Sequence, residues 1–170
     1  LKMIREQGMQ VMLTLFHHSE PRWTYRYGGW HEKRMLADFR QFSQKVVSTL
    51  APHIDYLVTF NEAQVYALMT QVAGQWPYHR RANALALFNL GPLKGRFERA
   101  LRNMAEAHRE FYQWSKRQGY TFPVGIAHNV AIYRESGFLS RLPVWISWKK
   151  MNFRFADLIA QETDFLGLNY

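Results

Sequence analysis

The residues best suited to chemistry in this chain are Asn61 and Glu62, which follow directly on the run Tyr56–Phe60. That run is β-branched and aromatic, and it is long enough for one buried strand. A carboxylate next to an amide is a pair that can handle protons and hydroxyl groups. The structural alternative is that Glu62 begins a helix, where a carboxylate favours the positive end of the helix dipole. Position alone leaves both interpretations open.

Polar residues also follow the three other predicted strands. They are His17 with His18, His128 with Asn129, and Asn169. In a barrel of parallel strands the carboxyl ends of the strands line one mouth, so we expect these residues to converge there with Glu62. Helix capping could explain any one of them, but it does not readily explain a polar residue at every strand end.

Aromatic residues in the intervening segments add to this predicted mouth. They are Trp23, Trp30, Trp76 and Tyr78. Flat aromatic faces beside amides and imidazoles suit a sugar, because its C–H faces stack while its hydroxyl groups need hydrogen bonds. Each aromatic residue alone is more often part of a core, so the grouping carries this inference.

Other chemistries find less support. His17 and His18 are consecutive at a strand end and should point to opposite sides, and no His-Glu-x-x-His helix is present, so we expect no metal site. A serine nucleophile would need a Gly-x-Ser-x-Gly turn, which is missing. No glycine-rich phosphate loop follows any predicted strand, and we expect no cofactor.

The predicted elements alternate between strands and helices. The strands cover Gln10–Phe16, Tyr56–Phe60, Phe122–Ala127 and Asp164–Leu168, and the helices cover His31–Leu50, Arg96–Gln118 and residues 148–161. This alternation implies right-handed crossovers and a parallel sheet. We therefore predict an α/β fold, namely a partial (β/α)8 TIM barrel with about four parallel strands and three crossover helices. An open doubly wound sheet is the second choice.

Two of the predicted helices have clear faces. In the first, apolar residues recur every three or four positions, which marks a buried face. They are Met35, Phe39, Phe42, Val46 and Leu50. In the second, His108 lies on the apolar stripe, and we interpret it as a hydrogen-bonded structural histidine rather than a ligand. The connection from Gly74 to Pro92 has no period and should be irregular.

The composition narrows the class of protein. The 170 residues are 48% hydrophobic, so the chain can form a core and reads as one globular unit, although its two ends suggest a fragment. The net charge of +9 arises from basic residues scattered among acidic ones on helical segments, so we expect no nucleic-acid partner. There is no apolar run of about 18 residues, so we expect no membrane partner. The absence of cysteine suits a cytoplasmic protein without requiring one.

Three segments resemble glycoside hydrolase family 1, the β-glucosidases and their relatives. The segment from Thr14 to Pro21, followed by Gly28-Gly29-Trp30, is similar to the third strand of that family. Thr59-Phe60-Asn61-Glu62-Ala63 resembles its Asn-Glu-Pro motif, and the segment from Asp164 to Tyr170 resembles its sixth strand. Because the three segments occur in the family's order, residues 1–170 would be a single-domain fragment covering about strands three to six.

The resemblance implies a retaining β-glycosidase. Glu62 would be the general acid/base, Asn61 would hold the sugar 2-hydroxyl, and His17 and Asn169 would bind the substrate, a β-glycoside or oligosaccharide. Trp30 would then be structural.

The chain also departs from the family pattern. Ala63 stands where the family usually has proline, and His18 stands where it usually has tryptophan. The nucleophilic glutamate lies on a later strand, so we expect the fragment by itself to be inactive. The alternative is a non-catalytic sugar-binding or scaffold protein.

Overall fold

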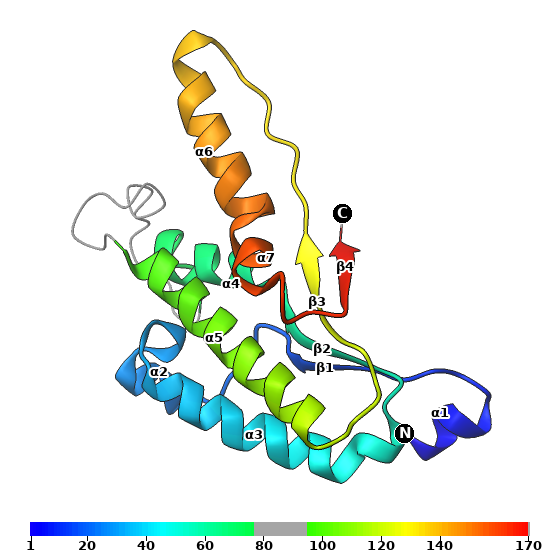
Figure 1. Cartoon of the computed structure of the whole chain (residues 1–170). Helices are drawn as coiled ribbons and strands as arrows, with labels where there is room; N and C mark the ends of the chain where they lie inside the picture. The colour runs from blue at the N-terminus through cyan, green and yellow to red at the C-terminus, as the bar shows by residue number, and fades with distance from the viewer. Residues whose placement is uncertain (77–94, 170) are drawn as a thin grey trace.

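The computed structural model describes residues 1–76 and 95–169, and Figure 1 shows its arrangement around one parallel sheet. The strand order is β1-β2-β3-β4, and each neighbouring pair is parallel. The strands are β1 (Met12–Phe16), β2 (Tyr56–Asn61), β3 (Val124–Asn129) and β4 (Phe165–Asn169). This sequential order has no reversal, which a doubly wound sheet requires. The predicted class, α/β with parallel strands and intervening helices, is confirmed.

Helices connect the strands. They are α1 (Lys2–Glu6), α2 (Thr24–Tyr27), α3 (Arg34–Leu50), α4 (Ala63–Ala67), α5 (Arg96–Arg117), α6 (Arg141–Asn152) and α7 (Arg154–Ile159). Short 3-10 turns lie at Gly29–His31, Ala51–His53 and Phe138–Ser140, and a π turn at Leu68–Val72 follows α4. Figure 1 shows α3 and α5 side by side below the sheet, whereas α6 extends away from it. None of the described helices is both long and apolar enough to cross a membrane.

An aromatic cluster forms the centre of the core between the sheet and its helices. The indole of Trp30 is fully buried and makes edge contacts with Phe16 of β1, Phe39 of α3 and Phe60 of β2. The rings of Phe39 and Phe60 stack with their centroids 5.0 Å apart. Large rings of this kind bury much apolar surface, so the cluster fixes α3 against β2, the strand that leads to Glu62.

The buried face of α3 differs from the predicted one. Met35 and Phe39 are buried as expected, but Phe42 is exposed and Ser43 and Val47 are buried instead. The buried residues follow a spacing of four from residue 35, and Ser43 falls on this stripe although it is polar. Its hydroxyl donates to the Arg40 carbonyl, which allows burial.

The helix predicted over residues 148–161 is also wrong in its extent. Two helices occupy this part of the chain, because α6 begins at Arg141 and the backbone breaks at Phe153 (φ −122°) before α7. Pro143 is tolerated in the first turn of α6, where the lost N–H has no helical partner. The helix therefore starts well before its apolar period becomes readable.

The remaining predicted elements agree with the structure within a few residues. β3 runs two residues further than expected, so His128 and Asn129 are its last residues rather than the residues after it. The predicted helices over His31–Leu50 and Arg96–Gln118 appear as α3 and α5. Residues 77–94 of the predicted irregular connection, including Tyr78, lie outside the described residues.

Candidate active site

Glu62 occupies a backbone position that few residues adopt. Directly after β2 its backbone is left-handed, with φ 50° and ψ 51°. Such a conformation costs a non-glycine residue on the order of 1 kcal/mol and must be held by its surroundings. The Glu62 N–H donates to the Ala127 carbonyl at 2.7 Å, and its carbonyl accepts the first bond of α4 from the Tyr66 N–H. The chain is thus turned sharply at the strand end.

The side chain of Glu62 does not cap the helix that follows. Glu62 stands at the N-cap of α4, but its carboxylate makes no capping hydrogen bond. It accepts instead a bond of 2.8 Å from Nδ2 of Asn169, at the end of β4. The Glu62 side chain therefore makes its hydrogen bond across the sheet and not to the start of α4.

Asn169 joins the residues at two strand ends. Its Nδ2 also donates to Oδ1 of Asn61 at 3.1 Å. The parallel register explains this meeting, because Asn61 pairs with Ala127 of β3 and Asn129 of β3 pairs with Asn169. The predicted convergence of Asn61, Glu62 and Asn169 at one edge of the sheet is confirmed.

His128, the penultimate residue of β3, is almost completely buried. Its Nε2–H donates to the Asn152 carbonyl at 2.9 Å, which leaves Nδ1 as an acceptor with no hydrogen-bond partner among the described residues. Burial lowers the pKa of His128, and the Glu62 carboxylate acts in the opposite direction. The hydrogen bond of His128 thus ties the end of β3 to the last residue of α6.

Two supporting amides were missed by sequence reasoning. The Asn152 side chain makes two hydrogen bonds to the backbone of Ala131, shortly after β3. Its Oδ1 accepts from the Ala131 N–H, and its Nδ2 donates to the Ala131 carbonyl. Gln64, the second residue of α4, donates to the Asn129 carbonyl at 2.8 Å. Both amides bond to backbone groups far away in the sequence, and buried polar groups of this kind are seen only once the chain is folded.

At the end of β1 the two histidines differ in surroundings. His17 is exposed, and its ring lies with its centroid 5.5 Å from that of His18. His18 has a left-handed backbone (φ 61°) and packs its ring against Tyr66 and Trp76. Burial lowers the pKa of His18, opposed by the Glu62 carboxylate among other groups. The structure thus places His17 beside His18 but gives it no bond to Asn61, Glu62 or Asn169.

Glu20 is a further residue that sequence reasoning missed. Its carboxylate accepts hydrogen bonds from the hydroxyl groups of Tyr66 and, at 2.9 Å, Thr24. Burial raises the pKa of Glu20, although both hydrogen bonds act the other way. The contact with Tyr66 ties the loop after β1 to α4, the helix that begins at Glu62.

The predicted ring of aromatic residues around the mouth is wrong for two of its members. Trp30 is buried in the core, as the family resemblance implied. Trp23 packs against Tyr27 and lines a hollow of about 250 Å³ with Phe39 and Phe42, beside α3. Trp76 packs against His18, which follows β1, with the two rings tilted by 41° and their centroids 5.0 Å apart.

His108 is structural, as predicted. The Thr59 hydroxyl donates to its Nδ1 at 2.6 Å, and its Nε2–H donates to the Glu162 carbonyl at 2.6 Å. Burial lowers the pKa of His108 to about 4. Within residues 1–76 and 95–169 no group of three or more His, Asp or Glu side chains is arranged to hold a metal ion.

Comparison with known proteins decides the family. The model of glycosyl hydrolase family 1 matches residues 1–136. The chain belongs to glycosyl hydrolase family 1. A β-glucosidase from Exiguobacterium marinum superposes on 99% of the chain with a TM-score of 0.79 at 20% sequence identity, and the match covers 44% of that structure. A family 1 β-glucosidase from Thermotoga maritima gives a TM-score of 0.78 at 17% identity and is covered to 43%. The fold is therefore part of a family 1 barrel.

Two plant relatives match along the whole chain. A protein named β-glucosidase-like SFR2, chloroplastic, from Oryza sativa is 38% identical over 173 residues. A protein named galactolipid galactosyltransferase SFR2, chloroplastic, from Arabidopsis thaliana is 37% identical over 172 residues. The chain spans 27% and 28% of the length of these two relatives.

The geometry at this edge of the family 1 sheet determines which proton transfers and hydroxyl contacts its side chains can make. A carboxylate lies at a strand end, held by one amide and next to a second, Asn61, which is largely buried. Such an arrangement can deliver a proton to a bound oxygen and receive one back, while the amides hold hydroxyl groups.

Proposed function

We propose that the complete protein carrying this chain is a retaining β-glycosidase in which Glu62 is the general acid/base. The observation that carries the proposal is the hydrogen bonding of the Glu62 carboxylate to Asn169 across the sheet, in place of a cap on α4. Asn61 would hold the sugar 2-hydroxyl, and His17 and Asn169 would bind the sugar. Ala63 in place of the usual proline leaves this arrangement in place, because α4 still begins there.

The proposed reaction has two steps and needs a second carboxylate about 5–5.5 Å from the first. In the first step Glu62 donates its proton to the glycosidic oxygen while the second carboxylate attacks the anomeric carbon. The leaving group departs as an alcohol, and the sugar becomes esterified to the enzyme. In the second step the Glu62 carboxylate takes a proton from water, whose oxygen displaces the second carboxylate from the opposite face of the anomeric carbon. Each step inverts this carbon, so the overall configuration is retained. That carboxylate would come from a strand beyond these residues.

A second candidate is transfer to a sugar hydroxyl instead of water. The name of the Arabidopsis relative, a galactolipid galactosyltransferase matched along the whole chain, favours it. The same Glu62 carboxylate would then deprotonate the acceptor sugar. Incubation with an aryl β-galactoside and a galactolipid distinguishes the two, because transfer lengthens the acceptor whereas hydrolysis releases free galactose. The expected cytoplasmic location stays a prediction, and both plant relatives are named as chloroplastic proteins.

The test of Glu62 uses Glu62→Ala in the complete protein. Leaving groups that are poor need protonation, so cleavage of alkyl glycosides should fall by about 10²–10⁴-fold, while aryl glycosides with acidic leaving groups should lose much less in the first step. The glycosyl-enzyme should then accumulate, because no base activates water.

Azide needs no base and fits the vacated space, so it should restore turnover and give a β-glycosyl azide. An α-glycosyl azide would show that Glu62 is the nucleophile. Equal loss on all substrates without azide rescue would remove the assignment. Glu106→Ala, a substitution on α5 outside the strand ends, serves as the matched control and should leave all of these rates unchanged.

A further inference from the structure

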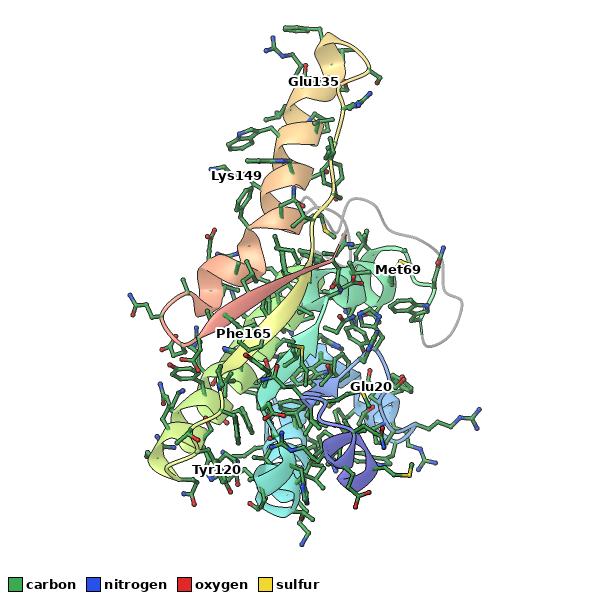
Figure 2. All side chains as sticks on the ribbon, turned by 90° about the vertical axis from the view of Figure 1, so that its right-hand side faces the viewer. Glu20, Met69, Tyr120, Glu135, Lys149 and Phe165 are labelled. Atoms are coloured by element: carbon green, nitrogen blue, oxygen red, sulfur yellow. The ribbon has the colours of Figure 1, made fainter. Side chains whose placement is uncertain are left out.

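Residues 130–153 form an arm that stands away from the rest of the described chain. It leaves β3 directly after Asn129, turns at Phe138–Ser140 and returns through α6 to Phe153. Figures 1 and 2 show it extending beyond the ends of β3 and β4, with Glu135 near its far end and Lys149 further down α6. The arm therefore rises from the edge of the sheet that carries Asn169 and Glu62.

The arm carries the most exposed large apolar side chains of the described residues, two of them at its tip. Leu139 is 90% exposed, Ile132 is 87% exposed and Phe138 is 82% exposed. Along α6 the exposed apolar residues continue. They are Leu142, Trp145, Trp148 and, at the end of the arm, Phe153. A soluble surface rarely shows so many adjacent large apolar groups, so this surface is expected to contact something.

The charges of the arm identify the kind of partner. Residues 130–153 contain four basic residues and one acidic residue. The acidic one, Glu135, is already paired with Arg141, with Nε and Oε2 3.4 Å apart. Lys149 lies with its ammonium 5.1 Å from the ring centre of Trp145. The apolar groups of the arm are flanked by Arg134 and Arg141, and Lys149 lies over Trp145. This combination fits a partner that has an apolar interior and anionic groups at its surface.

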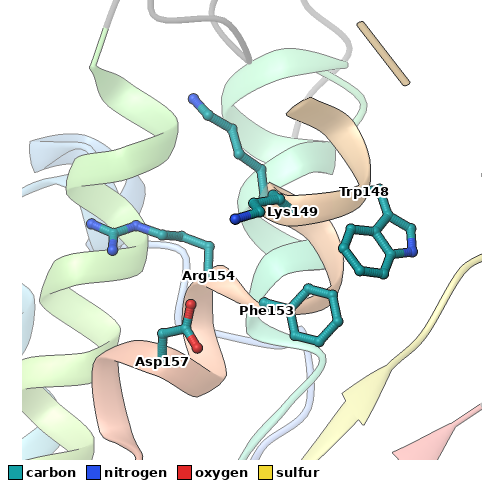
Figure 3. Close-up of a pocket in the computed structure, with 6 residues that line it drawn as sticks. Trp148, Lys149, Phe153, Arg154 and Asp157 are labelled. Atoms are coloured by element: carbon teal, nitrogen blue, oxygen red, sulfur yellow. The ribbon is translucent and has the colours of Figure 1, made fainter. Parts of the chain in front are cut away.

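The base of the arm has the same mixed character. A hollow of about 410 Å³ lies where α6 meets α7, lined by Trp148, Lys149, Lys150, Phe153, Arg154 and Asp157. Figure 3 shows the rings of Trp148 and Phe153 on one side of it and the cationic groups on the other. Arg154 forms an ion pair with Glu98. Of the three cationic residues that line the hollow, Lys149 is the exposed one.

We propose that the arm docks on a lipid bilayer that carries anionic headgroups, with Phe138 and Leu139 inserted below them. A protein groove usually receives one apolar stripe of a helix, whereas the apolar residues of α6 are not confined to one stripe. Trp145 and Trp148 suit the boundary between headgroups and acyl chains. The sequence led us to expect no membrane partner because no span is present, but docking on a surface needs none.

The consequence concerns the proposed active site. Because the arm begins at Asn129, docking would bring the strand ends that carry Glu62 and Asn169 toward the lipid surface. A glycoside headgroup of a lipid would then be within reach of the site. This consequence rests on the proposed function, whereas the docking itself does not.

The test measures binding of the complete protein to phosphatidylcholine vesicles with and without phosphatidylglycerol. Phe138→Ser combined with Leu139→Ser should weaken binding to phosphatidylglycerol vesicles by about tenfold or more, because two large apolar side chains no longer enter the bilayer. Phe42→Ser, which changes a half-exposed apolar residue of α3, is the matched control and should bind as the unchanged protein does.

A second pair of variants tests the charges. Arg134→Gln with Arg141→Gln should lower binding by about tenfold at low salt, only where phosphatidylglycerol is present. The control is Arg99→Gln with Arg40→Gln. Arg40 forms an ion pair with Glu110, just as Arg141 forms one with Glu135. It should leave binding unchanged.

The proposal is overturned if the tip variant binds vesicles as well as the control. It is equally overturned if a polarity-sensitive dye at Leu139→Cys reports an apolar environment in the complete protein before vesicles are added, because another part of the protein or a partner then covers the arm. Hydrolysis of a soluble aryl glycoside is measured in parallel. Its absence in the unchanged protein would count against the proposed function and leave the vesicle result readable.

Discussion

The strand-end edge and the arm place the same types of residue in opposite surroundings. At the strand ends the polar side chains bind one another, as Asn169 does with Glu62 and Asn61, and the nearby Trp30 is fully buried. On the arm Trp145 is 54% exposed, and the neighbouring apolar groups contact solvent. The first region is largely explained by contacts inside the described chain. The second region makes few such contacts.

The largest expected difference between the two regions is in the free energy of unfolding after one tryptophan is removed from each. Trp30→Ala should lower the free energy of unfolding of the complete protein by about 3–5 kcal/mol, because it leaves a cavity among Phe16, Phe39 and Phe60. Trp145→Ala should change it by less than about 0.5 kcal/mol, since its ring is half exposed. Chemical denaturation of both variants checks the prediction. A large loss for Trp145→Ala would mean that the arm is buried in the complete protein.

A second prediction uses pH and concerns the buried histidine His108. His108 has a folded pKa of about 4, below the ordinary value of 6.5, so the unfolded chain binds more protons between these values. Stability is therefore unaffected above pH 6.5 and falls as pH drops toward 4, by about 3 kcal/mol in total. In His108→Gln, whose amide can accept from Thr59 and donate to Glu162, this part of the slope should disappear.

The control for this measurement is His17→Gln, the same substitution at an exposed histidine outside the core. Urea denaturation at several pH values between 4 and 7 measures both variants. The outcome against the assignment is an equal slope in His108→Gln and the unchanged protein.

The sequence predicted the strand-end edge better than the arm, and the physical reason is the range of the interactions. β2 and its end at Glu62 follow from a local apolar run that stops at polar residues, and α5 follows from its period. The hydrogen bonds of Asn152 to Ala131 and of Glu20 to Tyr66 join residues 21 and 46 positions apart, and no local pattern reveals them. Trp30 was misplaced at the mouth because a tryptophan in a loop gives no sign of its burial.

The arm escaped prediction for a different reason. Its apolar residues have no helical or strand period, because no single face of α6 is buried, and the sequence gives no element to which they could be assigned. Only Met151 and Asn152 of α6 are buried. The helix was therefore predicted from residue 148 onward, where contact with the core restores the period.

The smallest expected effect concerns Asn169, and it separates two roles. If Asn169 positions the Glu62 carboxylate, Asn169→Ala should slow alkyl glycosides by about ten- to hundredfold, the worth of one hydrogen bond to a charged group. Aryl glycosides with acidic leaving groups should lose less in the first step, because they depend less on the acid. If Asn169 only binds the sugar, both substrates should slow equally. Asn129→Ala, at the paired position of β3, is the control and should not change the dependence on the leaving group. Kinetics over a series of leaving groups make this measurement, and because the comparison is a ratio between substrates, a general loss of folded protein cannot imitate the positioning role.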